Sequence, residues 1–84
     1  MDQLRTRIDA LFREIGSIKN YQYWADMRKL IMGCEVVYRD LSRELVNCNR
    51  LHKKTLKFNE LVAQLDSAIL HAEQQLTFVK LLDN

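Results

Sequence analysis

Apolar side chains recur every seven residues through most of this chain, and no proline interrupts them. Two series carry the pattern, offset by three residues, and only Thr55 and Glu44 break their apolar character. Paired series with this spacing are typical of helices that pack lengthwise against other helices. The sequence therefore predicts an all-α fold. The first series is Met27, Cys34, Leu41, Cys48, Thr55, Val62, Ile69 and Leu76, and the second is Leu30, Val37, Glu44, Leu51, Phe58, Leu65, Ala72 and Val79.

A shorter apolar series precedes the heptads and has a different phase. It consists of Leu4, Ile8, Leu11, Ile15 and Ile18. Between the two patterns, Gly16 suits the C-terminal end of one helix and Asn20 suits the N-cap of the next. We therefore predict a short helix over residues 2–15, a turn over 16–20 and a long helix over 21–81.

The asparagines on either side of Cys48 mark the one place where the long helix has an alternative. Asparagine favours caps and turns, so a break at 47–49 would give three helices over 2–15, 20–46 and 50–82. The heptad phase passes through these residues unchanged, which favours a continuous helix. In both cases the first helix, ~21 Å long at ~1.5 Å per residue, is too short to cover the longer apolar face.

The long apolar face therefore requires cover from another chain. Apolar residues at flanking heptad positions make it broader than a two-stranded coiled coil needs, which indicates more than one neighbouring helix. We predict a single helical domain over 1–84 that forms a coiled coil or helical bundle with partner chains, as a hetero-oligomer in preference to a homo-oligomer. The flanking residues are Ile31, Tyr38, Leu45, Leu56, Leu61, Ala63, Ala68, Leu70, Phe78, Leu81 and Leu82. The predicted partner interface comprises Trp24, Leu41, Glu44, Leu51, Phe58, Val62, Leu65, Ile69, Leu76 and Val79.

Two members of this interface have particular roles. Glu44 is costly to bury without a partner, and we expect an Arg or Lys of another chain to pair with it. Trp24 either packs on the first helix near Phe12 and Ile15 or anchors a protein partner, since tryptophan dominates many interface hot spots. Packing is the preferred interpretation of Trp24.

A basic patch of Arg50, Lys53, Lys54 and Lys57 lies in a stretch without acidic residues. Such a patch either keeps an apolar helix soluble or binds an acidic partner or a phosphate backbone. The net charge of +2 and the absence of interleaved aromatic residues argue against nucleic-acid binding as the main role. A homo-oligomeric bundle that binds nucleic acid or an acidic partner through residues 50–57 is the alternative function.

Residues with catalytic or metal-binding chemistry are sparse. Cys48 and His52 are four residues apart and could share a helix face, but Cys34 and His71 lie too far along the helix to complete a zinc site. Two glycines cannot build a phosphate-binding loop. The sequence therefore predicts no enzyme activity, no metal and no cofactor.

The remaining signals concern the cellular compartment. Both cysteines fall on the apolar face, where thiols act as small hydrophobic groups, and this favours a reducing environment. No apolar run approaches the ~20 residues of a membrane span, and the first residues lack the order of a signal peptide. We expect a cytoplasmic or nuclear protein whose function is non-enzymatic: a structural subunit that assembles with other helical proteins.

Overall fold

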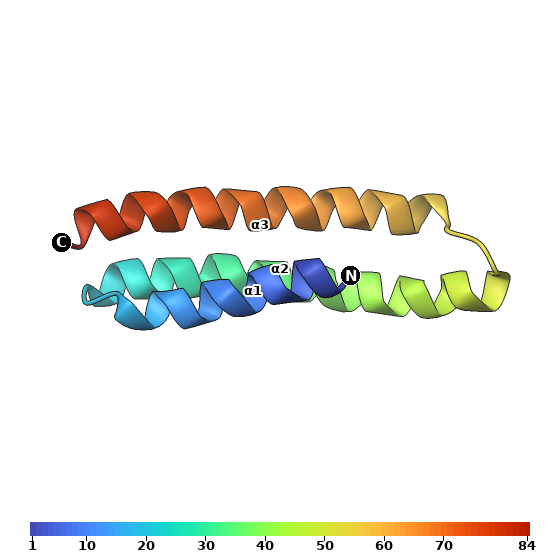
Figure 1. Cartoon of the computed structure of the whole chain (residues 1–84), viewed down its shortest axis with the longest axis horizontal. Helices are drawn as coiled ribbons and strands as arrows, with labels where there is room; N and C mark the ends of the chain where they lie inside the picture. The colour runs from blue at the N-terminus through green and yellow to red at the C-terminus, as the bar shows by residue number, and fades with distance from the viewer.

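The chain folds into three helices, of which the two long ones form an antiparallel hairpin (Figure 1). The computed structural model describes residues 1–84, with no strand, and so confirms the all-α prediction. The short helix lies along the half of the hairpin that is nearer the C-terminus (Figure 1). The elements are α1 (Asp2–Glu14), a 3-10 turn (Ile15–Ser17), α2 (Tyr21–Leu51) and α3 (Leu56–Leu82).

The connection between α1 and α2 lies where the sequence predicts a turn. Asn20 caps α2, because its side-chain oxygen accepts a hydrogen bond from the backbone N–H of Tyr23 at 3.0 Å. Gly16 does not take the left-handed conformation expected of it, because the 3-10 turn ends α1 instead. The carboxylate of Asp83, just after α3, accepts from the backbone N–H groups of Lys19 and Asn20, each at 2.9 Å. The end of α3 is thereby fastened to this connection.

The continuous helix predicted over 21–81 does not form. The chain reverses after Leu51, a few residues beyond the alternative break at 47–49. His52 has φ 56° and ψ 32°, a left-handed conformation that ends α2, and the backbone N–H of Lys53 bonds to the carbonyl oxygen of Cys48 at 3.1 Å. Thr55 then caps α3 by accepting from the backbone N–H of Phe58 at 3.1 Å. Thr55, one of the two residues that interrupt the heptads, is therefore a helix cap.

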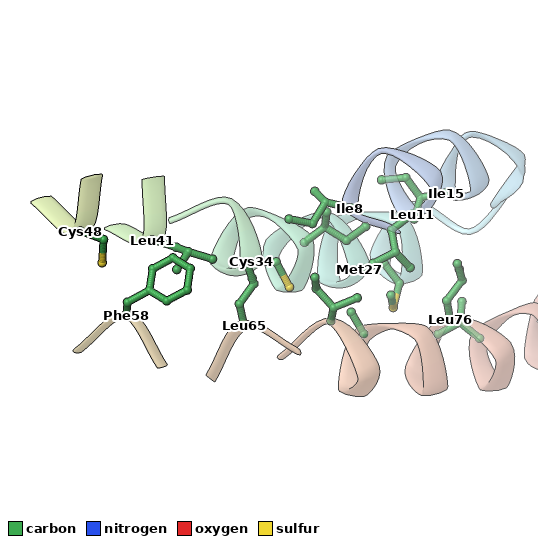
Figure 2. Close-up of a cluster of buried hydrophobic side chains, with 14 residues drawn as sticks. Ile8, Leu11, Ile15, Met27, Cys34, Leu41, Cys48, Phe58, Leu65 and Leu76 are labelled. Carbon is green, nitrogen blue, oxygen red and sulfur yellow. The ribbon is translucent and has the colours of Figure 1, made fainter. Parts of the chain in front are cut away.

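A core of 14 buried apolar side chains runs between the three helices (Figure 2). The residues of α2 and α3 on the inward face of the heptad pattern contact each other across the hairpin, and the inward face of α1 packs on one end of it. The chain thus covers much of its own apolar face. The core residues are Ile8, Leu11, Ile15, Met27, Ile31, Cys34, Leu41, Cys48, Phe58, Leu65, Ile69, Ala72, Leu76 and Val79.

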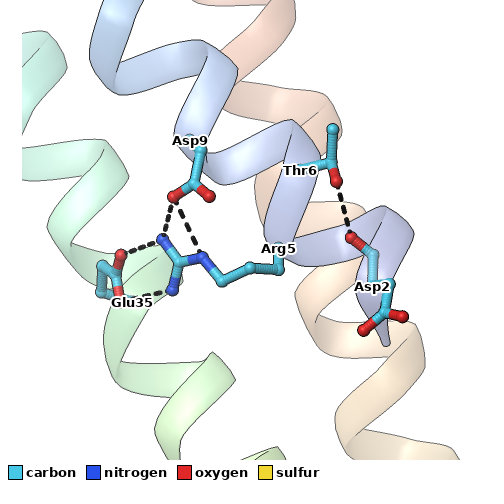
Figure 3. A network of polar contacts seen from close by, with 5 residues as sticks. All are labelled: Asp2, Arg5, Thr6, Asp9 and Glu35. Atoms are coloured by element: carbon cyan, nitrogen blue, oxygen red, sulfur yellow. Dashed lines mark hydrogen bonds and ion pairs between the residues drawn. The ribbon is translucent and has the colours of Figure 1, made fainter.

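Ion pairs hold α1 against both long helices. Arg5 bonds to Glu35 of α2 and, at 2.7 Å, to Asp9 of its own helix (Figure 3). Hydrogen bonding to Glu35 raises the pKa of Arg5, and the same bond lowers the pKa of Glu35. These pairs are partly exposed, so each contributes less than ~1 kcal/mol, and their main effect is to set the position of α1.

A second arginine of α1 fastens it to α3. Arg7 pairs with Asp66 and with Glu73, each at 2.6 Å, and Lys80 of α3 reaches back to Glu14 at 2.8 Å. The 13 residues of α1 span only ~20 Å at 1.5 Å per residue, in a molecule 50 Å long. The N-terminus accordingly lies near the middle of the hairpin (Figure 1).

Candidate docking surface

Most of the predicted partner interface lies inside the chain's own core. Six of its apolar residues are at most 9% exposed, because the hairpin turns the two halves of the heptad pattern toward each other. This corrects the expectation that another chain covers them: a turn at residues 52–55 supplies the covering helix from within the chain. The six residues are Leu41, Phe58, Leu65, Ile69, Leu76 and Val79.

Glu44 also finds its partners within the chain. One of its carboxylate oxygens accepts hydrogen bonds from the side-chain amide of Asn47 and from the hydroxyl of Thr55, both at 2.9 Å. These bonds, the one from Asn47 foremost, lower the pKa of Glu44, so the carboxylate stays ionised. The side chain links α2 to the cap of α3, where the sequence suggested pairing with a basic residue of another chain. Spacing alone could not reveal this, because Glu44 and Thr55 meet only when the chain reverses.

Three predicted interface residues keep part of their surface exposed. Trp24 packs against the edge of the core, with its ring centroid 5.9 Å from that of Tyr21 in the same helix. Val62 is half-buried and Leu51 is exposed, and both lie toward the turn between α2 and α3. Leu51 belongs to the part of the hairpin that α1 does not reach, and Val62 lies at the edge of that part, beside the N-terminus of α1.

An open groove continues the line of α1 along the hairpin. Its α2 wall includes Leu45, one heptad beyond Tyr38, whose ring lies under the guanidinium of Arg5 at 4.9 Å. Its α3 wall includes Val62, one turn before Asp66, the partner of Arg7. Residues at these spacings share a helix face, so both walls lie on the side that α1 occupies farther along.

Two surface depressions mark the ends of this groove. One, of about 460 Å³, lies at the N-terminus of α1 and is lined by Met1, Leu4, Val62 and Ala63 among others. The other, of about 320 Å³, lies at the turn and is lined by Leu45, Cys48, Asn49, His52, Lys53 and Lys54. The groove between α2 and α3 thus has half-buried apolar walls and no third helix. We call it the open half-groove.

The predicted basic patch surrounds the turn at one end of the open half-groove. Arg50, Lys53, Lys54 and Lys57 form no ion pair within the chain. Arg50 donates a hydrogen bond to Asn47, and the ammonium group of Lys54 lies 5.6 Å from the ring centroid of Phe58. Lys53 and Lys54 line the depression at the turn, whereas Lys57 lines a different depression beside Glu44. The four cations are therefore spread around the turn, and none is neutralised by an ion pair.

The cysteines and histidines do not assemble a reactive centre. Cys34 and Cys48 are buried free thiols, and burial raises the pKa of Cys34, which makes its thiol less reactive. No group of three or more His, Cys, Asp or Glu side chains is arranged to hold a metal ion. The surfaces that remain as candidates for binding another molecule are the open half-groove, the basic patch and the exposed face of α3.

Comparison with known proteins adds no further identification. Neither protein-family models, nor curated protein sequences, nor solved structures show a match to this chain. None of its helices combines the length and the apolar character that crossing a membrane requires.

Proposed function

We propose that this protein is a non-enzymatic assembly subunit that binds a helix of another protein in the open half-groove. The observation that supports this most strongly is the mismatch in helix length. α1 has 13 residues and covers one half of a hairpin built from helices of 31 and 27 residues. A partner helix in line with α1 would complete a three-helix bundle over the other half, as helices with broad apolar faces require.

The chemistry of the groove specifies what the partner helix carries. Leu45 and Val62 offer apolar walls, so the partner presents an apolar stripe with helical spacing. The four cations of the basic patch favour acidic residues at the end of the partner helix that meets the turn, because opposite charges orient the two chains during association. This charge pattern favours a different protein as the partner, and hence a hetero-oligomer.

The proposal is tested by site-specific photocrosslinking in the cells that make the protein. A photoreactive residue at Asn59, which is exposed and lines the groove, is compared with one at Lys29, which is exposed on the half of α2 beside α1. The partner protein captured at Asn59 is then purified, and its affinity for this chain is measured. Asn59→Trp should lower this affinity at least tenfold, about 1.4 kcal/mol, because the bulky ring fills the groove, whereas Lys29→Trp should leave it unchanged. Equal affinity for both variants would refute the proposal.

Nucleic-acid binding through the basic patch is the second candidate, supported by the four unpaired cations. Binding of this kind weakens steeply with salt, with a slope set by the number of phosphates contacted. Titration of a DNA duplex against increasing salt should then show a slope that falls when Lys53 and Lys57 are changed to Glu. This candidate would be eliminated if DNA binding were undetectable at moderate salt, or if the substitutions left the salt dependence of binding unchanged.

A further inference from the structure

The third helix has a second apolar face that points away from the rest of the chain. From Leu61 to Val79 the only charged residues are Asp66 and Glu73, and both pair with Arg7 of α1. Lys80, one residue farther, pairs with Glu14 of the same helix. The charges in the C-terminal two-thirds of α3 are therefore turned toward α1, and the outward side of that stretch carries none.

Large apolar side chains occupy this outward side. Leu56 is 75% exposed, Leu70 48%, Phe78 57% and Leu81 71%, and Ala63, Ser67 and Gln74 lie between them at helical spacing. A helix that is apolar on two opposite faces is typical of the interior of a larger bundle. The sequence contained this signal as the row Leu56, Ala63 and Leu70, but it did not show that the opposite face would be covered from within the chain.

We propose that two copies of this chain pair through the outward face of α3, with the two α3 helices antiparallel. The face has no charge between Leu61 and Val79, so a second copy meets no like charge there. In the register that places Leu56 opposite Leu81 of the second copy, Ser67 lies opposite Leu70 and Glu60 lies opposite Thr77. Leu56 then meets Leu81 and Leu70 meets the small Ser67, while Phe78 lies opposite Asn59 of the second copy. The contact is self-complementary, as twofold symmetry requires.

Charge selects the antiparallel arrangement over the parallel one. In a parallel pair Glu60 would face Glu60 of the second copy, and the two basic patches would meet at the same end. Like charges at such short distances are unfavourable. In the antiparallel pair the basic patches lie at opposite ends of the contact, which extends ~38 Å from residue 56 to residue 81 at ~1.5 Å per residue.

The size of the face predicts a weak dimer. A strip ~38 Å long and ~10 Å wide buries roughly 400 Å² on each copy, about 800 Å² in total, at the low end for specific association. The contact and the open half-groove share only the edge of α3 at Asn59 and Ala63, which also line the depression near the N-terminus of α1. The apolar walls at Leu45 and Val62 lie between α2 and α3, whereas the outward face of α3 points away from α2. The dimer therefore leaves these walls available for the proposed partner.

Sedimentation equilibrium of the purified chain across the micromolar range tests the dimer. We expect reversible monomer–dimer association that Leu70→Asp and Leu81→Asp each abolish. Val46→Asp, at an equally exposed position of α2, should leave it unchanged. Far-UV circular dichroism establishes that each variant folds. Because Leu81 is more exposed than Leu70, its substitution should disturb the fold of the monomer less. A monomer at all concentrations, or equal effects of the three substitutions, would overturn the proposal.

Disulfide trapping tests the orientation. In the antiparallel dimer, a mixture of Leu56→Cys and Leu81→Cys chains should form mixed disulfides under mild oxidation, while neither chain should form them with itself. A parallel dimer would give the reverse, and that result would refute the proposed arrangement. Because both native thiols are buried, they should not contribute. Photocrosslinking at Asn59 in the Leu81→Asp variant, which should not dimerise, should still capture the partner, so failure of the dimer and failure of the partner proposal can be told apart.

Discussion

The two halves of the α2–α3 hairpin follow the same heptad pattern but are completed differently. Beside α1, the apolar face is closed by a third helix, which Arg5 and Arg7 pin to its neighbours. Toward the turn, two helices are joined by the bonds among Glu44, Thr55 and Asn47, and their flanks stay half-buried. Regular spacing of apolar residues therefore specifies that helices contact each other, but not how many helices take part. The half with fewer helices is the one where we propose that a partner helix binds.

The largest expected effect lies in the half that α1 covers. Ile31 is fully buried, so Ile31→Ala should lower the free energy of unfolding by about 2–5 kcal/mol through lost contacts and a residual cavity. Leu45→Ala, in the open half, should cost less than half as much, because the side chain is already partly exposed. Urea unfolding followed by circular dichroism measures both. Equal costs would show that the two halves are packed alike.

A smaller effect is expected at the cap of α3. Thr55→Ala removes the bond to the backbone N–H of Phe58 and should cost about 0.5–2 kcal/mol, as the loss of an N-cap does. The substitution also removes the hydroxyl that donates to Glu44. Thr55→Ser keeps both bonds and should recover most of the stability in the same unfolding measurement. If serine were no better than alanine, the hydroxyl would not have this role.

A substitution in the turn between α2 and α3 should raise the stability modestly. His52 is the only residue other than glycine with a positive φ, and a side chain in this conformation costs about 1 kcal/mol. His52→Gly should therefore raise the thermal midpoint slightly, because glycine adopts this conformation without steric cost. His71→Gly is the matched control: it lies within α3, where glycine should lower the midpoint. A lower midpoint for His52→Gly would contradict the left-handed turn.

Acid should weaken both halves through different carboxylates. Arg5 lowers the pKa of Glu35 in the covered half, and Asn47 and Thr55 lower that of Glu44 in the other. Because folding lowers both values, the stability they provide is complete above the unfolded pKa of about 4.3 and is lost as the pH falls through the folded values. Thermal midpoints should fall below about pH 4.5, and Glu35→Gln and Glu44→Gln should each flatten that decline. If the pH profile of either variant were unchanged, the carboxylate replaced in that variant would not contribute to the loss of stability in acid.

The sequence was sufficient for the all-α fold and for the first helix, and insufficient for the division of the long helix and for the site. The heptads and the phase change near Gly16 located the first helix and the turn after it, because these are local patterns. The turn at 52–55 was not located from the sequence because it contains neither glycine nor proline. Thr55 also occupies a heptad position, so it resembles a polar interruption of a continuous helix. Its hydroxyl accepts from the backbone N–H three residues later, which any residue except proline supplies. The signal that could have been used was therefore Thr55 itself, a preferred N-cap residue type.

The sequence by itself determined that this protein is all helical, that its helices have apolar faces along their length, and that the first helix is too short to cover the others. These properties follow from the spacing of side chains along a helix, which neighbouring residues set. Only the tertiary structure decided which apolar residues are covered. Reversal at His52 brings Leu41 and Leu65 into one core, gives Glu44 its partners and turns Leu70 and Leu81 outward. Each of these outcomes depends on contacts between residues far apart in the chain, and such contacts exist only once the chain has turned back on itself.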